Sequence, residues 1–224
     1  MDRSGTSAIT RLINMMGAGI GPAHLIGEPA LDNEKGFWER TDVSKLNDQL
    51  LELNDCTWDE LANFNPATLA RDVPAEAGDQ LRRIIFQMDT QRPWVLKDPR
   101  LCLTFPVWRP LLEVPVCVLP YRSPLAIARS LRARNGFDLL QGIALWEEYT
   151  LAALTASQGL PRFTVSYEKL ILDPKGVVTE LYEALCAADL VGLRMPSDRE
   201  ITAFIETRLQ HQPGIFAGSE GLLN

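Results

Sequence analysis

The sequence predicts an α/β domain with a mainly parallel sheet. Three short β-rich runs, 94–96, 114–119 and 163–165, are separated by longer segments with helical periodicity, and the first two end in polar or turn residues. Strands alternating with helices are typical of a parallel sheet covered by helices, with a ligand crevice at the carboxyl ends of the strands. The chain of 224 residues is long enough for one such domain, which we expect to span residues 1–224.

The helices are predicted from apolar residues that recur every three to four positions. They cover 7–16, 41–53, 77–88, 124–134, 137–157, 174–187 and 198–206. The first begins directly after Arg3-Ser4-Gly5-Thr6, and a loop rich in Gly and Pro, 17–36, leads to the second. Pro124 suits the first turn of its helix, because proline has no N–H group for the helix to leave unpaired.

Composition excludes several classes of protein. The net charge of -7 argues against a general nucleic-acid binder. The longest nearly uncharged strand-like run, 114–121, is far shorter than the roughly 20 apolar residues of a membrane span, and the first residues lack an apolar signal core. We therefore expect a cytoplasmic protein without a membrane span.

Cysteine and histidine are too few and too scattered for the common metal centres. The four cysteines have no pair closer than fifteen residues, so neither a CxxC redox site nor a zinc-ligand cluster is predicted. Only His24 and His211 are present, which makes a histidine-built metal site or a Ser/His/Asp hydrolase unfavourable. We expect no metal.

One segment reverses the overall charge. Between Arg92 and Arg134 the chain has eight basic residues and two acidic ones. Such segregation in an acidic protein indicates a confined site for an anion, with a solvated basic face as the alternative.

The opening residues have the composition of a phosphate-binding loop. Arg3-Ser4-Gly5-Thr6-Ser7 combines a cation, a glycine and hydroxyl groups just before a helix, whose N-terminus offers unpaired N–H groups and partial positive charge. The alternative is an ordinary helix N-cap. The chain has no GxxxxGK[ST] motif for ATP or GTP, which weakens a third interpretation, a nucleotide kinase.

The loop and three later segments together resemble a known family. Arg3-Ser4-Gly5-Thr6-Ser7 is similar to the 5′-phosphosulfate loop of sulfotransferases that use 3′-phosphoadenosine 5′-phosphosulfate (PAPS). Lys97-Asp98-Pro99 resembles the lysine segment at the sulfuryl site, Arg122 and Ser130 match the pair that binds the 3′-phosphate, and Tyr167 lies in a segment like that near the adenine. The resemblance spans roughly residues 3–175, and 36–39 and 46–48 look particularly like bacterial members.

The resemblance implies a three-layer P-loop-like fold and direct in-line transfer of a sulfuryl group from PAPS, without a metal, to a hydroxyl or amine. Arg3 and Lys97 would stabilise the transferring group, and the N–H groups of Gly5, Thr6 and Ser7 would hold the 5′-phosphate. The family places a hydrophobic strand before the loop. Since only Met1 and Asp2 stand there, the sheet is expected to lack that first strand.

The group that accepts the proton is left open between carboxylates. Family members acting on small phenols and alcohols carry a histidine after the lysine, whereas this chain has Asp98 there. Other branches use a Glu on the loop after the first helix, for which Glu28 fits by distance and Glu39 by its Gly-Phe-Trp-Glu setting. Asp98 is a third option, with pairing to a nearby Arg as its alternative role.

The acceptor and assembly are not specified by the sequence. A small-molecule or carbohydrate acceptor fits, and Trp38, Trp58 and Phe64 are candidates for an apolar acceptor pocket or for core packing. A sheet edge left open by the absent strand favours pairing with another copy. The main alternative to an enzyme is a catalytically impaired member that binds a nucleotide or a partner.

Overall fold

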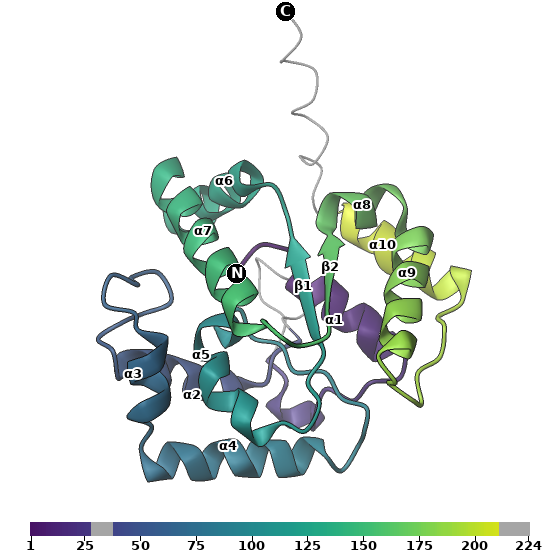
Figure 1. Cartoon of the computed structure of the whole chain (residues 1–224). Coiled ribbons are helices and arrows are strands. Elements are labelled where there is room, and N and C mark those ends of the chain that lie inside the picture. The colour runs from purple at the N-terminus through teal and green to yellow at the C-terminus, as the bar shows by residue number, and fades with distance from the viewer. Residues whose placement is uncertain (28–37, 211–224) are drawn as a thin grey trace, which may run out of the picture.

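The computed structural model describes residues 1–27 and 38–210 and has the mixed helix and strand content expected of an α/β protein (Figure 1). In chain order the elements are α1 (Thr6–Met15), η1 (Ala23–Leu25), α2 (Thr41–Glu52), α3 (Pro66–Arg71), α4 (Ala75–Met88), α5 (Leu101–Trp108), η2 (Arg109–Leu111), β1 (Cys117–Tyr121), α6 (Pro124–Asn135), α7 (Leu139–Ala156), β2 (Arg162–Ser166), α8 (Tyr167–Leu172), α9 (Pro174–Ala187) and α10 (Asp198–Gln210).

The regular sheet consists of two parallel strands. β1 pairs with β2 in register from Cys117 opposite Arg162 to Tyr121 opposite Ser166. Two of the three predicted strands are thus confirmed, each shifted or extended by a few residues. In the described residues, no strand precedes the opening loop.

The prediction of a strand at 94–96 is wrong, because these residues form no strand of the sheet. Trp94 forms only an isolated parallel bridge with Gly19, in which Gly19 N–H donates to Pro93 O at 2.8 Å and Val95 N–H donates to Gly19 O at 2.8 Å. A ladder needs an extended partner of similar length, and the residues around Gly19 are a loop between α1 and η1. The segment is therefore extended but not part of the sheet.

The seven predicted helices are confirmed with small changes at their ends. Three more helices form where no amphipathic stripe marks them. α5 is apolar on nearly all sides and contains Pro106, whereas α3 and α8 are only six residues long. Asn65 caps α3 and Ser166 caps α8, each through its side-chain oxygen, so local capping starts these short helices.

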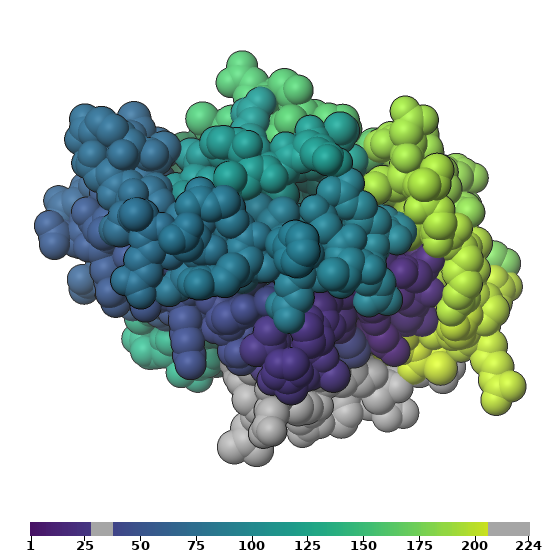
Figure 2. All heavy atoms as spheres, turned by 90° about the horizontal axis from the view of Figure 1, so that it is seen from below, coloured from purple at the N-terminus to yellow at the C-terminus, as the bar shows by residue number. Residues whose placement is uncertain are grey.

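Helices lie on both sides of the strand pair (Figure 1). α1, β2, α9 and α10 share one hydrophobic cluster, against which Val118 of β1 also packs. A second cluster joins α2, α3, α4 and α5, and a third joins α6 and α7 to Leu103 of α5. Seen from below, the C-terminal helices (yellow) form one flank, residues of α2 to α4 (blue) form the other, and N-terminal residues (purple) lie between them (Figure 2).

A buried polar contact fixes α2 against α5. Asn47 Oδ1 accepts hydrogen bonds from Thr104 Oγ1 at 2.9 Å and from Trp108 Nε1 at 3.0 Å, and Asn47 and Thr104 are completely buried. Because buried donors need an acceptor, this one oxygen sets how the two helices face each other. Their packing positions residues 97–100, which lead into α5.

None of the described helices combines the length and the apolar character that crossing a bilayer requires.

Candidate functional site

The opening loop presents main-chain N–H groups that no side chain caps. Gly5 is the N-cap of α1 with a left-handed φ of 92°, and its carbonyl accepts from Ala8 and Ile9. Ser4 is buried and its Oγ donates to Met1 O at 2.7 Å, away from the helix end. Within residues 1–27 and 38–210, the N–H groups of residues 5–7 have no hydrogen-bond acceptor. The ordinary N-cap is therefore not what forms, and these groups can bind an anion.

Tyr167 holds the loop from the side. A Cβ on residue 5 would overlap Tyr167 Cδ2, so only glycine fits between the ring and the loop. Arg122 Cζ lies 4.8 Å from the centre of the same ring. Tyr167 is 1% exposed. Since so little of the side chain is accessible, its observed role is to position Gly5 and Arg122, and its predicted contact with adenine stays a prediction.

Arg122 and Ser130, predicted as a phosphate-binding pair, both contact Arg3. Arg122 Nη1 donates to Arg3 O at 3.0 Å, and Arg3 Nε donates to Ser130 Oγ at 2.8 Å. Arg122 follows the end of β1 and Ser130 lies on α6, so the strand end, the helix and the loop meet at one place. Arg3 itself has a left-handed backbone, with φ 62°.

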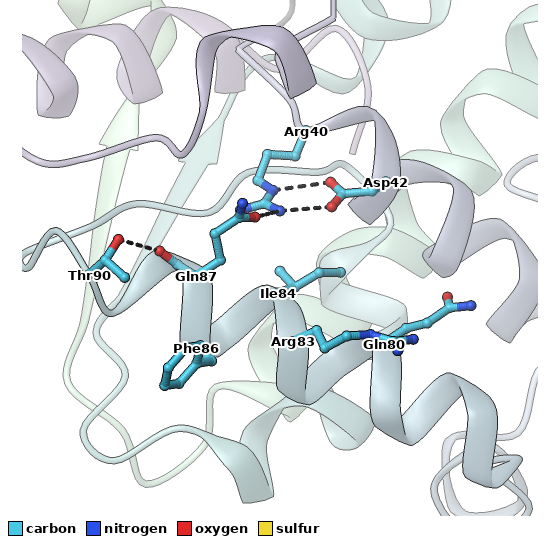
Figure 3. Close-up of a pocket in the computed structure, with 8 residues that line it drawn as sticks. All are labelled: Arg40, Asp42, Gln80, Arg83, Ile84, Phe86, Gln87 and Thr90. Carbon is cyan, nitrogen blue, oxygen red and sulfur yellow. Dashed lines mark hydrogen bonds and ion pairs between the residues drawn. The ribbon is translucent and has the colours of Figure 1, made fainter.

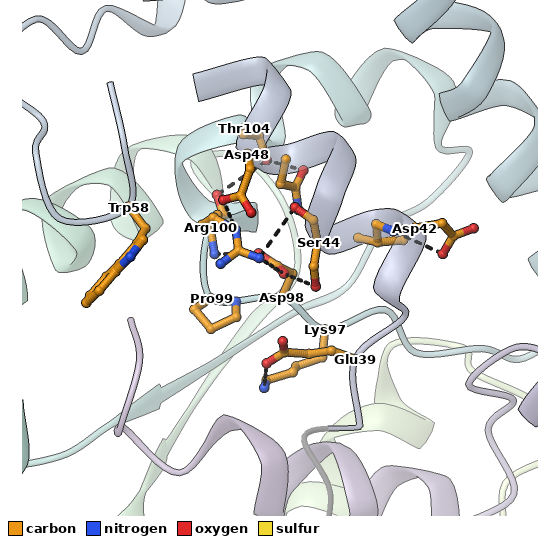
Figure 4. Close-up of polar contacts among 12 residues, drawn as sticks. Glu39, Asp42, Ser44, Asp48, Trp58, Lys97, Asp98, Pro99, Arg100 and Thr104 are labelled. Atoms are coloured by element: carbon orange, nitrogen blue, oxygen red, sulfur yellow. Dashed lines mark hydrogen bonds and ion pairs between the residues drawn. The ribbon is translucent and has the colours of Figure 1, made fainter. Parts of the chain in front are cut away.

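Lys97 lies at the first turn of α1 together with Glu39. Lys97 Nζ donates to Ser7 Oγ at 3.2 Å and forms an ion pair with Glu39 Oε1 (Figure 4). The two side chains are 7% and 16% exposed. Burial raises the pKa of the Glu39 carboxyl above its usual range, and although Lys97 acts in the opposite direction, the nearby charge of Asp98 adds to the rise.

Asp98 has a structural environment. Its carboxylate is fully buried and accepts from Ser44 Oγ at 2.8 Å, Arg100 N at 2.8 Å and Arg100 Nη2 at 2.9 Å (Figure 4). Arg100 Nε also lies 3.1 Å from Asp48 Oδ1. The oxygens of Asp98 thus accept from three donors, which are Ser44 Oγ and two nitrogens of Arg100. This favours pairing with an arginine over the role of a proton-accepting base. Glu28, the other candidate, lies outside the described residues.

Asp2 and Arg134 were not predicted from the sequence, yet they adjoin the loop. Arg134 Nη2 lies 2.6 Å from Asp2 Oδ2. Burial opposes ionisation of Asp2, but the ion pair and hydrogen bond with Arg134 outweigh it and hold the pKa of this carboxyl below its usual range, with Lys97 contributing. Arg134 is four residues after Ser130 and so shares its helix face, a spacing that could have identified it.

The structure divides the basic segment 92–134 into paired and unpaired cations. Arg92, Lys97, Arg100 and Arg134 each form an ion pair with a carboxylate. In contrast, Arg109, Arg122, Arg129 and Arg132 have no ion pair in the described part of the chain. Three of these four lie at the carboxyl end of β1 or on α6. Positive charge that no described carboxylate neutralises is thus gathered at and beside the predicted 3′-phosphate pair.

The aromatic candidates for an acceptor pocket are engaged in packing. Arg11 Cζ lies 4.6 Å from the centre of the Trp38 ring, and Trp58 stacks on Phe137 with ring centres 5.8 Å apart. Phe64 packs against two of the hydrophobic clusters. For Trp58 and Phe64 these contacts support the core alternative, and the acceptor stays unspecified.

A separate hollow of about 470 Å³ lies beside α4 (Figure 3). It is lined by Arg40, Asp42, Gln80, Arg83, Ile84, Phe86, Gln87 and Thr90. The buried guanidinium of Arg40 is already bonded to Asp42 and Gln87. None of the residues predicted from the sequence for the site lines this hollow.

No His, Cys, Asp or Glu side chains gather in groups of three or more that could hold a metal ion, as far as residues 1–27 and 38–210 are concerned. Comparison of the chain with protein-family models, curated protein sequences and solved structures gave no match.

Proposed function

We propose that the protein is a PAPS-dependent sulfotransferase with a three-layer P-loop-like fold. One observation carries the proposal. The uncapped N–H groups of the opening loop lie between Lys97, which contacts Ser7, and the Arg122–Ser130 pair, which contacts Arg3. A nucleotide with a phosphate at each end of its ribose needs such an arrangement, with two anion-binding groups joined by one loop.

The chain offers each part of the nucleotide a suitable group. The N–H groups of Gly5, Thr6 and Ser7 suit the 5′-phosphate, because they point from a helix N-terminus with partial positive charge. Arg122 uses one of its five N–H donors in the hydrogen bond to Arg3 O, so other donors remain for the 3′-phosphate. Ser130 Oγ accepts from Arg3 and still has its own proton to donate.

PAPS would supply an activated sulfuryl group on a phosphate leaving group. Lys97 would stabilise the negative charge that develops between sulfur and the leaving oxygen, and it would do so from a buried position where electrostatic attraction is stronger than in water. Glu39 would accept the proton of the acceptor, since its raised pKa brings it closer to neutral pH than an ordinary glutamate.

A second candidate, a nucleotide-binding module without sulfuryl transfer, is favoured by the Lys97–Glu39 ion pair. That pair neutralises the cation assigned to catalysis. The module would bind 3′-phosphoadenosine 5′-phosphate (PAP) but transfer no sulfuryl group to any acceptor in a broad panel of phenols, alcohols, amines and sugars. The enzyme would bind PAP and would also transfer a sulfuryl group to at least one acceptor.

The proposal is tested by thermal stabilisation. PAP should raise the melting temperature more than AMP or ATP at equal concentration, because only PAP occupies both ends of the site. The preference should be lost in Arg122→Ala and retained in Arg109→Ala, which removes an exposed arginine on η2 that has no ion pair with described residues. An equal response of the unmodified protein to all three nucleotides would rule out the proposed site.

A further inference from the structure

Arg3 and Lys97 belong to two different parts of the site. The sequence resemblance assigned both cations to the transferring sulfuryl group. In the structure, Arg3 Nε donates to Ser130 Oγ at 2.8 Å, whereas Lys97 Nζ contacts Ser7 Oγ at 3.2 Å and pairs with Glu39. The carbonyl of Arg3 also accepts from Arg122 Nη1 at 3.0 Å. Arg3 is therefore joined to both members of the predicted 3′-phosphate pair.

We infer that the Arg3 guanidinium is a third ligand of the 3′-phosphate and does not act on the sulfuryl group. This assignment rests on the proposed function. It turns the pair into a three-residue anion site, made of two guanidinium groups and the Ser130 hydroxyl. Each guanidinium is a planar fork that can bind two phosphate oxygens. The sulfuryl end is then left with Lys97 and the main-chain N–H groups.

Backbone geometry supports the assignment. Arg3 has φ 62°, a left-handed conformation that is unfavourable for residues other than glycine. In this conformation its carbonyl reaches Arg122 while its side chain reaches Ser130 on α6. The contacts on both sides hold the residue in place, so the guanidinium is oriented before a ligand arrives and loses little conformational entropy on binding.

The charge around α6 supports it as well. Arg122, Arg129 and Arg132 have no ion pair with described residues, so a doubly charged phosphate there meets cations that no described carboxylate neutralises. Around Lys97, by contrast, Glu39 forms an ion pair with the lysine, and the charge of Asp2 adds to the rise in the pKa of Glu39. The part of the site that Arg3 adjoins is thus the more favourable one for a second phosphate.

Two nucleotides that differ only in the 3′-phosphate separate the two roles. Calorimetric titration with PAP and with AMP gives their affinity ratio for each variant. In Arg3→Ala we expect PAP to bind about 10- to 100-fold more weakly, the usual effect of losing a charge-assisted contact, with AMP affinity within about twofold of the unmodified protein. Lys97→Ala should weaken both nucleotides alike and leave the ratio unchanged.

Two further variants guard the test against a general loss of structure. Arg3→Lys keeps a positive charge but not the planar fork, so it should lose part of the preference for PAP and fold even where alanine does not. Arg109→Ala removes an exposed arginine on η2, outside the group of arginines on α6, and should leave the ratio within about twofold.

The outcomes are distinct. A drop in the PAP-to-AMP ratio for the Arg3 variants alone supports the inference. Equal weakening of PAP and AMP in the Arg3 variants would assign Arg3 to the 5′ end and overturn it, while the proposed function would stand. An unmodified protein that does not prefer PAP over AMP would overturn both.

Discussion

At the scale of single residues, Gly5 is a position that tolerates little change. Its φ of 92° is left-handed, and a Cβ there would overlap the ring of the buried Tyr167. A side chain at residue 5 would therefore lower the stability of the fold in two separate ways, through backbone strain and through the overlap with Tyr167. Because Tyr167 also contacts Arg122, any shift of the ring that makes room for a side chain would be passed on to the strand-end arginine.

Gly5→Ala should therefore destabilise the fold more than the backbone conformation alone explains. Gly136 is a matched control, since it has φ 77° and nothing within 4 Å of an added Cβ. We expect Gly136→Ala to cost about 1–2 kcal/mol of unfolding free energy and Gly5→Ala about 1–3 kcal/mol more, as measured by urea denaturation. Equal costs for the two variants would contradict the packing of Tyr167 against the loop.

Residue types in the site were predictable, whereas the directions of their side chains were not. Arg3, Lys97, Arg122 and Ser130 stand out by chemistry and by order along the chain. Ser4 donates to Met1 O, three residues before it, instead of capping α1, and the residue types alone do not indicate this direction. Likewise, the pairing of Asp2 with Arg134 joins residues 132 positions apart.

At the scale of elements, α6 holds the opening loop through side-chain contacts. Arg122 leads into α6, and Ser130 and Arg134 lie on it. All three contact residues 2 and 3. Side-chain contacts from one helix and from the residue that leads into it therefore fix the position of the loop.

The ion pair between α6 and the loop makes a pH-dependent contribution to stability. The pKa of Asp2 is lower in the folded protein than its usual 3.8, so its stabilising effect is complete well above that value and is lost as the pH falls through the lowered pKa. Asp2→Asn should cost up to about 1 kcal/mol at pH 7. This difference should disappear as the pH falls through the lowered pKa of Asp2, as followed by urea denaturation across the pH range.

Asp79→Asn is the control for that experiment. Asp79 pairs with Arg82 at 2.6 Å on the exposed face of α4, with both side chains about 60% exposed. Exposed pairs of this kind are worth little, so the variant should change stability by less than about 0.5 kcal/mol at any pH. A pH-independent effect of Asp2→Asn would contradict the role of the ion pair.

The elements that periodicity predicts are those with one apolar face. α9 was predicted with its observed bounds, and α2 ends one residue earlier than predicted, because both pack one side on the core and expose the other. α5 has no such stripe, since it is surrounded by α2, α3 and α7. The segment 94–96 has strand-like composition, but whether a segment joins a ladder depends on its neighbours in space.

At the scale of the whole molecule, the strand pair leaves one edge of β1 without a partner strand in the described structure. Cys117 N–H donates to Pro161 O, so residues 117, 119 and 121 direct their main-chain groups to β2, and Val118 and Pro120 direct theirs to the other side. Pro120 has no N–H group. The open edge therefore offers a single donor, that of Val118, over the length of the strand.

Proline at this position should protect the molecule from self-association through the edge. Edge strands invite pairing with other chains, and proline is a common way to block it. We expect Pro120→Ala to restore a donor and to shift the protein toward dimers or larger species as concentration rises. Sedimentation velocity over a concentration series measures this.

The matched control is Pro124→Ala, which removes a proline at the first turn of α6, where no strand donor is gained. It should sediment as the unmodified protein does. If Pro120→Ala associates no more strongly than this control, packed side chains and not the missing N–H group keep the edge of β1 closed, and the two-stranded sheet would be protected by the helices that flank it.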